Sequence, residues 1–219
     1  MYNIVLKMNN NKGKIKKKEK ISLFGRGKEK ILECFYRNRK KEIYFSEILR
    51  ETKLTQNTTL KHLKNLQQNN LVISIKKIGN TFYKINPKNM QVYSIFSYFD
   101  YKRLNELPFE KKRAIFEFLD KLSIKPLMAL IFGSTAKGTF GKESDIDVLL
   151  VYNKKELQDS KLKKDIEATT GVKIQTFIID FNYFKDQITK EEDKVITHAI
   201  KTGFAVTGND KFYKEILNG

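Results

Sequence analysis

The stretch LIFGSTAKGTFGKESDIDVLLVY, residues 130–152, decides the fold of the C-terminal half of the chain. Two apolar runs, 127–132 and 148–152, flank a polar centre and have the length of buried strands. Gly133-Ser134 follows the first run directly, and Asp145-Ile146-Asp147 precedes the second after ten intervening residues. The pattern therefore predicts two strands, with polar residues gathered where the first strand ends and the second begins.

The polar residues of this stretch suit a triphosphate and a divalent metal ion. Glycine at position 133 permits a sharp exit from a strand and the close approach of a phosphate, and Ser134 offers a hydroxyl and a backbone amide at the start of a short helix. Asp145 and Asp147 are two residues apart, so on a strand their side chains project from the same face. We expect both aspartates to be catalytic residues that hold Mg²⁺ (or Mn²⁺), because Mg²⁺ is bound by a few carboxylates together with substrate phosphates and water. Lys137 is expected to assist Gly133 and Ser134 in nucleotide binding, and a solvated lysine is an equally good interpretation.

The same unit closely resembles the signature of the polymerase β nucleotidyltransferase superfamily, which is Gly-Ser, ten residues and Asp-x-Asp between apolar strands. It looks like the minimal nucleotidyltransferases, which are small archaeal and bacterial domains. The resemblance implies a small mixed-sheet α/β domain that moves a nucleoside monophosphate from an NTP to a hydroxyl and releases pyrophosphate. It also brings a protein acceptor into consideration, because minimal members have been associated with antitoxins that adenylylate a tyrosine of a partner toxin.

One position departs from the superfamily pattern. Its members often supply a third carboxylate from the strand expected here at 172–179, where this chain has Gln175. A glutamine cannot hold a metal as a carboxylate does. Asp180 lies five residues further on and therefore on the opposite strand face, so it is a weak substitute. We expect nucleotide and metal binding, while Gln175 leaves the efficiency of transfer open.

The remaining C-terminal sequence predicts further helices and strands. Asn153 is the expected cap of a long polar helix that ends near Thr170, and a helical stretch at 191–202 precedes a strand and turn at 203–208. His198 lies within this helical stretch and is interpreted as a hydrogen-bonded helix residue rather than a catalyst.

The N-terminal half has the pattern of three helices followed by a hairpin. A helix from Gly25 precedes an extended piece at 43–45, Ser46 is the expected cap of a second helix, and Thr55 is the expected cap of a third. Strands at 71–75 and 82–85 flank a predicted turn at Gly79-Asn80. The third helix is expected to bury Leu60, Leu63 and Leu66.

Residues 54–72, LTQNTTLKHLKNLQQNNLV, are similar to the turn, recognition helix and first wing strand of winged-helix transcription factors. The resemblance implies that this chain binds double-stranded DNA. Winged-helix proteins often bind DNA as dimers, so a homodimer is considered. Ordinary solvent exposure is the competing interpretation for each polar residue. The resemblance assigns the base edges to Gln56, Asn57, Thr59 and His62, and the phosphates to Lys61, Lys64, Lys76 and Lys77.

The net charge of +18 is concentrated in the N-terminal half, where residues 1–90 hold 22 Lys or Arg against 6 Asp or Glu. The other 129 residues hold 21 against 19. A basic half attracts polyphosphates through counterion release, which supports DNA binding. The competing interpretation is a basic proteome in which lysine is a common surface residue. The lysine-rich beginning of the chain is expected to be a flexible basic arm.

The predicted fold is α+β: an arm at 1–24, a winged helix-turn-helix domain at 25–90, a helical connector at 91–108 and a minimal nucleotidyltransferase domain at 109–219. Helices are expected at 92–107 and 109–122, separated by Pro108. The side chain of Phe116 is expected in the protein interior. No run approaches the about 20 apolar residues of a membrane helix, and no signal peptide is evident, so a cytoplasmic protein is expected. Cys34 has no internal disulfide partner and is expected in the core.

The sequence thus predicts a nucleotidyltransferase, with ATP and Mg²⁺, coupled to a DNA-binding domain. The alternative is a DNA-binding transcriptional regulator or antitoxin whose transferase domain senses nucleotide or is catalytically weak. The acceptor, the base preference, the DNA site and the oligomeric state are left open by these patterns.

Overall fold

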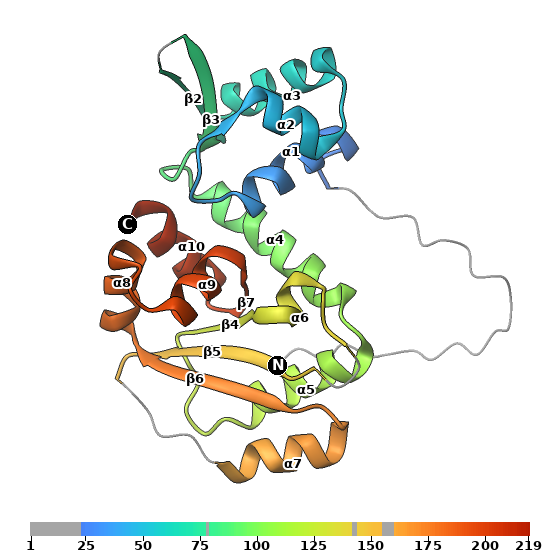
Figure 1. Ribbon diagram of the computed structural model, residues 1–219, viewed down its shortest axis with the longest axis vertical. Helices are drawn as coiled ribbons and strands as arrows, with labels where there is room; N and C mark the ends of the chain where they lie inside the picture. Colours follow the sequence, from blue (N-terminus) through green and yellow to red (C-terminus); the bar gives the residue numbers. More distant parts are fainter. Residues whose placement is uncertain (1–22, 78, 142–143, 155–159) are drawn as a thin grey trace, which may run out of the picture.

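A computed structural model describes residues 23–77, 79–141, 144–154 and 160–219, so most of the predicted basic arm lies outside the described residues. The fold is mixed α and β, with a small three-stranded sheet in the N-terminal part and a four-stranded mixed sheet in the C-terminal part (Figure 1). Within the described residues no helix is both long and apolar enough to span a bilayer. The N-terminal elements are α1 (Arg26–Arg37), β1 (Ile43–Tyr44), α2 (Phe45–Thr52), α3 (Gln56–Gln68), β2 (Val72–Lys77) and β3 (Asn80–Ile85).

These N-terminal elements follow the predicted order, with two corrections of boundaries. Helix α2 begins at Phe45, and the Glu47 carboxylate accepts a hydrogen bond of 2.9 Å from the Tyr44 amide, so Ser46 lies inside the first turn and is not the cap. Strands β2 and β3 pair Lys77 with Asn80, so Asn80 belongs to β3 and not to the turn predicted at Gly79-Asn80, and Gly79 precedes β3. Gly79 has a φ of 77°, the left-handed conformation that such a turn requires.

The buried face of α3 contains Leu63 and Leu66 as predicted, with Thr59 in place of Leu60. Thr55 caps the helix as expected, since its side chain accepts from the Thr58 amide. Thr59 is fully buried with Leu63 and Leu66, whereas 43% of Leu60 is exposed. The Thr59 hydroxyl donates to the Thr55 carbonyl at 3.0 Å, and this satisfied hydroxyl lets a polar residue occupy the buried stripe. The prediction that Thr59 faces solvent and Leu60 faces the core is therefore wrong.

Two helices lead into the C-terminal part: α4 (Gln91–Glu106) and α5 (Phe109–Lys121), separated at Pro108 as predicted. In α5 the buried stripe runs through Ala114, Ile115 and Phe118. Phe116 lies on the other side of that helix and is 52% exposed, so the prediction that it is interior is wrong. Helical period places Phe116 about 100° from Ile115 and about 160° from Ala114 and Phe118 around the helix axis.

The C-terminal sheet has the strand order β6-β5-β4-β7, with β4 antiparallel to both β5 and β7, and β5 parallel to β6. Helices α8 and α10 were not predicted. The expected cap at Asn153 does not adjoin the described start of α7, and residues 155–159 between them lie outside the described part. The elements are β4 (Met128–Phe132), α6 (Gly133–Lys137), β5 (Ile146–Tyr152), α7 (Ser160–Thr170), β6 (Ile174–Asp180), α8 (Phe181–Lys190), α9 (Lys194–Thr202), β7 (Phe204–Thr207) and α10 (Asn209–Asn218).

Helices cover both faces of this sheet (Figure 1). Ile131 and Val148 belong to the buried cluster that includes residues of α5 and α7. Leu130 and Leu149 point the other way and belong to the cluster formed with α8, α9 and α10. Because strand residues alternate between faces, these two apolar strands are buried on both sides, as their continuous hydrophobic runs predicted.

The N-terminal helices share a core with the C-terminal sheet. Asp100 of α4 is buried and accepts hydrogen bonds from the Tyr36 hydroxyl at 2.7 Å, the Tyr213 hydroxyl at 2.6 Å and the Asn209 amide at 2.8 Å. Burial raises the pKa of Asp100 to about 6, partly offset by these hydrogen bonds. Cys34 is buried in the same core, as predicted. The predicted domain boundary near residue 90 stays a prediction.

Candidate active site

Gly133 brings the Gly-Ser turn against the aspartates. It follows β4, has a φ of 67°, and a Cβ atom at this position would overlap the Oδ2 atom of Asp147. The adjacent β4 residue Phe132 is paired with Asp147 across the antiparallel strands. Only glycine therefore fits here, for both backbone and steric reasons. Ser134 is the next residue of α6 and lies at the same edge of the sheet.

The two aspartates lie where β5 begins. Asp147 is the second residue of β5, and Asp145 precedes the strand, its carbonyl accepting from the Thr135 hydroxyl at 3.3 Å. Burial raises the pKa of Asp147, and the charge of Asp145 raises it further. The two carboxylates thus repel one another in a partly buried place, which favours a cation between or beside them.

A buried lysine that the sequence reasoning missed lies next to these carboxylates. Lys111 of α5 donates from Nζ to the Ser144 carbonyl at 2.5 Å, and its amine lies 5.1 Å from the centre of the Phe140 ring. Burial lowers the pKa of Lys111, while Asp145 and Asp147 oppose that change. The sequence does indicate that Lys111 is buried, because it lies three residues before Ala114 and seven before Phe118, on the buried face of α5.

His198 of α9 also faces the site, which the sequence interpretation did not foresee. Its Nε2 atom lies 3.3 Å from the Thr202 hydroxyl, so the predicted helix partner is present. Burial lowers the pKa of His198, Lys137 lowers it further and Asp147 raises it. The imidazole therefore lies within electrostatic range of both Asp147 and Lys137. Lys137 itself is exposed at the end of α6.

Gln175, which stands where the resemblance expects a third carboxylate, lies on β6. Strand β6 pairs Gln175 with Asp147 in parallel register, so the two side chains share one face of the sheet. Asp180 is paired with Tyr152 at the other end of the strands, and its Oδ1 accepts from the Tyr183 amide at 2.9 Å as the cap of α8. Asp180 therefore cannot replace a third carboxylate.

The donor set fits a cation that takes its other ligands from substrate and water. In the part of the chain that the structure describes, no three His, Cys, Asp or Glu side chains gather into a metal-binding group. Lys173 lies 3.7 Å from the Asp145 carboxylate as a largely exposed ion pair. Two carboxylates suffice for Mg²⁺ when phosphate oxygens and water complete the octahedron, whereas a structural Zn²⁺ site would need four protein ligands.

Residues 111–207 match the family model of the nucleotidyltransferase domain. The match covers just under half of the chain, runs from α5 to the end of β7, and contains Gly133, Ser134, Lys137, Asp145 and Asp147. A solved structure titled "Crystal structure of the toxin-antitoxin with AMP-PNP" aligns with 49% of this chain and 82% of that chain, at 16% sequence identity and a TM-score of 0.34. None of the curated proteins matches this chain. The nucleotidyltransferase match thus includes the candidate site, and the N-terminal elements lie outside it.

Of the eight residues expected to contact DNA, some are exposed and others are buried or paired within the chain. Gln56, Asn57, Lys61 and Lys64 are exposed on α3, whereas Thr59 is buried and unavailable. The three residues 57, 61 and 64 follow helical spacing and therefore share one face.

His62 and the hairpin lysines have partners within the chain. The His62 imidazole packs closely against Gly27 of α1, where a Cβ atom would overlap it, and burial lowers its pKa. Lys77 pairs with Glu42 at 2.6 Å, and its amine lies 5.5 Å from the centre of the Phe82 ring, while Lys76 is exposed.

Proposed function

We propose that this chain transfers a nucleoside monophosphate from an NTP, ATP by expectation, to a hydroxyl acceptor with the help of Mg²⁺. One observation carries the proposal: the pairing of β4 with β5 brings Gly133-Ser134 against Asp147, inside the region that matches the nucleotidyltransferase domain. A phosphate-compatible turn beside two carboxylates is what transfer to a hydroxyl needs.

Each residue has a definite role in this proposal. Ser134 and the first amides of α6 bind the triphosphate, and Lys137 offsets part of its charge. Asp145 and Asp147 hold Mg²⁺, which would supply charge neutralisation and activation of the attacking oxygen. The acceptor oxygen forms a bond to the α-phosphorus while the bond from that phosphorus to pyrophosphate breaks. The lowered pKa of His198 keeps its imidazole neutral at pH 7, so it is a candidate acceptor for the hydroxyl proton.

Labelled nucleotide tests this function directly. The full chain is incubated with Mg²⁺ and each of four NTPs labelled at the α-phosphate, and with RNA, DNA and tyrosine-containing peptides, including candidate partner toxins, as acceptors. Label should transfer from at least one NTP, and Asp145→Asn and Asp147→Asn should lower the rate by at least about 100-fold.

The matched control is Asp165→Asn, which removes an exposed carboxylate from α7 and should leave the rate unchanged. Absence of transfer from all four NTPs to every acceptor, or an unchanged rate in Asp147→Asn, contradicts the proposed activity. In that case the alternative gains support: a regulator or antitoxin in which this domain senses nucleotide.

We also infer that the N-terminal elements form a winged helix-turn-helix that binds double-stranded DNA, as a dimer where two half-sites are present. Support comes from the order α1-β1-α2-α3-β2-β3, from the exposed face of α3 and from the N-terminal charge surplus. In this arrangement Gln56 and Asn57 approach base edges, while Lys61, Lys64 and Lys76 approach phosphates.

Salt-dependent binding tests the DNA proposal. Duplex DNA should bind with an affinity that falls as salt rises, and Lys61→Gln/Lys64→Gln should reduce the slope of log K against log salt by about 2, because each lost phosphate contact removes about 0.9. The control Lys164→Gln/Lys214→Gln removes two exposed lysines from α7 and α10 and should keep the slope. Equal loss in both variants, or binding to RNA alone, argues against this interface; the stoichiometry of the titration reports one or two chains per duplex.

A further inference from the structure

A cavity of about 520 Å³ lies between the N-terminal helices and the C-terminal sheet. Its walls come from α1, α4, α6 with the turn after it, and the end of α9. Residues 135–138 form one wall, whereas Gly133, Ser134, Asp145 and Asp147 are not among the described residues that line it. Helix α6 therefore separates this cavity, called here the basic cleft, from the aspartates.

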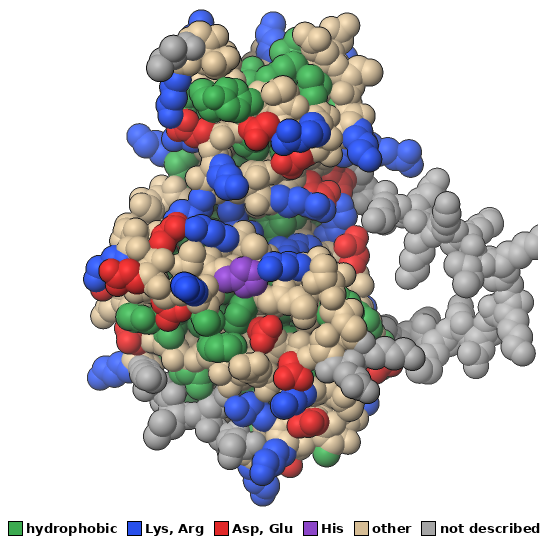
Figure 2. All heavy atoms as spheres, in the orientation of Figure 1, with side chains coloured by type: hydrophobic (Ala, Val, Ile, Leu, Met, Phe, Trp, Pro, Cys, Tyr) green, Lys and Arg blue, Asp and Glu red, His purple; other side chains and the backbone are tan. Residues whose placement is uncertain are grey.

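Positive side chains dominate the basic cleft. In Figure 2, lysine and arginine side chains gather across the region where α1 and α4 meet the C-terminal elements, with a few carboxylates among them. A surplus of one sign in a concave site concentrates ligands of the other sign. The charged lining residues are Arg37, Arg39, Lys102, Arg103, Lys137 and Lys201, against Glu33 and Glu106.

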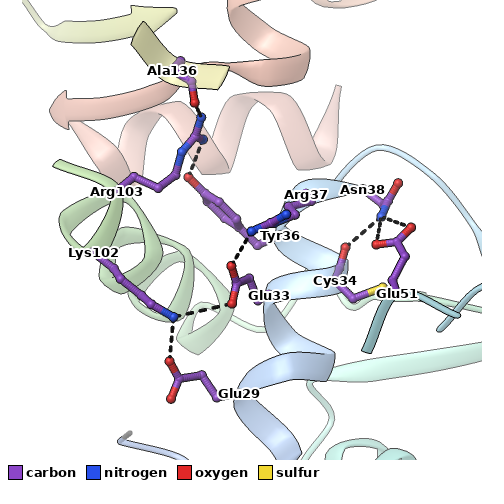
Figure 3. A network of polar contacts seen from close by, with 10 residues as sticks. All are labelled: Glu29, Glu33, Cys34, Tyr36, Arg37, Asn38, Glu51, Lys102, Arg103 and Ala136. Carbon is purple, nitrogen blue, oxygen red and sulfur yellow. Dashed lines mark hydrogen bonds and ion pairs between the residues drawn. The ribbon is translucent and has the colours of Figure 1, made fainter. Parts of the chain in front are cut away.

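The inner cations are held in place by the fold. Arg103 donates from Nη2 to the Ala136 carbonyl at 2.6 Å and from Nη1 to the Tyr36 hydroxyl at 2.9 Å (Figure 3). Its Nη2 also donates to the Thr202 carbonyl at 2.9 Å. Lys102 lies 3.0 Å from Glu29 and 3.5 Å from Glu33. These contacts fix the inner wall before any ligand arrives, which lowers the entropic cost of binding.

The cations at the mouth remain accessible. The Arg37 side chain is 70% exposed although it pairs with Glu33, and the Lys201 side chain is 50% exposed although it pairs with Glu191. Lys137 is exposed on the α6 wall between them and the candidate active site. Exposed ion pairs contribute little to stability, so a multivalent anion can replace their carboxylates at small cost.

The inner wall adds aromatic surface to this charge. The Arg103 guanidinium lies 4.7 Å from the centre of the Phe204 ring, and the half-buried Phe140 also lines the cleft. Planar rings stack on arginine and on aromatic side chains. The volume falls within the roughly 300–1,000 Å³ range of sites for small ligands.

We propose that the basic cleft binds a nucleoside phosphate at a second site, separate from the candidate active site. The phosphates lie at the mouth between Arg37 and Lys201, and the base lies inward against Phe140 and Arg103. A ligand with both a multivalent anion and a planar ring uses both parts of the cleft, which neither inorganic phosphate nor an uncharged ring can do. This binding does not depend on transfer activity, so it goes beyond the proposed function.

Equilibrium dialysis with labelled ATP in EDTA tests the second site. The full chain carrying Asp145→Asn/Asp147→Asn, which lacks the proposed metal ligands, should bind one ATP per chain. Adding Arg37→Gln/Lys201→Gln should weaken this binding by about tenfold or more, because two charge-assisted contacts are lost. Adding Lys164→Gln/Lys214→Gln instead makes the same change in net charge outside the cleft and should leave the affinity within about threefold.

Three results overturn the proposal: no saturable ATP binding in the aspartate variant, an affinity unaffected by the cleft substitutions, or equal weakening by the cleft and control substitutions. Inorganic triphosphate should compete at least about tenfold less well than ATP, because it lacks the ring. Equal competition shows a phosphate site and contradicts the nucleotide assignment. If circular dichroism shows the double cleft variant to be unfolded, Lys201→Gln alone, at an exposed position, gives the same comparison.

Discussion

Replacing Gly133 with alanine is expected to lower nucleotidyl transfer by at least about 100-fold, because a displacement of roughly 1 Å at a reacting centre can have an effect of that size. The new Cβ atom would overlap Oδ2 of Asp147, so either the aspartate or the turn must move. The residue also has a φ of 67°, which costs a non-glycine residue about 1–2 kcal/mol. The measurement is the rate of transfer from α-labelled ATP, together with the urea midpoint of unfolding.

Gly138→Ala provides a matched control. Gly138 has a φ of 71°, and a Cβ atom there would meet nothing within 4 Å. This variant should have the same backbone strain, with a loss of stability of about 1 kcal/mol, and nearly normal transfer. Equal loss of transfer in the two variants would show that backbone strain, rather than contact with Asp147, explains the effect.

The second large effect is expected at Arg39, whose loss should lower the free energy of unfolding by about 3 kcal/mol in Arg39→Ala, because a buried charged donor and its contacts disappear together. Arg39 is buried and donates to the Ile200 carbonyl at 3.1 Å and 2.6 Å and to the Gly203 carbonyl at 2.7 Å. Its guanidinium also lies 5.5 Å from the centre of the Phe212 ring. Urea unfolding of the full chain measures the change.

Two variants separate the causes of this loss. Arg37→Ala removes an arginine that is 70% exposed in a helical ion pair, and it should cost at most about 0.5 kcal/mol. Arg39→Lys keeps the charge but cannot donate from a planar fork, so its stability should fall between wild type and Arg39→Ala. If Arg39→Ala were no less stable than Arg37→Ala, the hydrogen bonds from Arg39 to the end of α9 would contribute nothing measurable.

Arg39 and Arg103 also connect the N-terminal helices with the candidate site. Both donate to the carbonyl groups at the end of α9, the helix that carries His198, and Arg103 also donates to Ala136 of α6. These hydrogen bonds and the shared core join the N-terminal helices to α6 and α9.

Much of the candidate site follows from local sequence. Apolar runs on either side of Gly133 and Asp147 predict two buried strands, and the observed strands begin and end within two residues of the predicted positions. The resemblance pointed to Gln175 as the residue in place of a third carboxylate, and its pairing with Asp147 comes from the structure. The prediction that Thr55 caps α3 also depended only on neighbouring residues, since its side chain accepts from the Thr58 amide.

Tertiary structure decided which side chains from distant segments join that site. Lys111 of α5 and His198 of α9 lie within electrostatic range of Asp147 because of tertiary packing. Helical spacing indicates that Lys111 is buried, but it does not show which residues of other elements lie beside it. Thr59 was misplaced because helical period leaves a one-residue ambiguity that its hydrogen bond to Thr55 resolves.

The sequence by itself therefore determined the Gly-Ser turn, the Asp-x-Asp pair and the strands that hold them, since these depend on short-range periodicity and on backbone conformation. Only the tertiary structure decided the lysine and histidine around the aspartates, the buried Arg39 and the basic cleft. Those features depend on long-range packing, where the free energy of burial and of hydrogen bonding is shared among elements far apart in the chain.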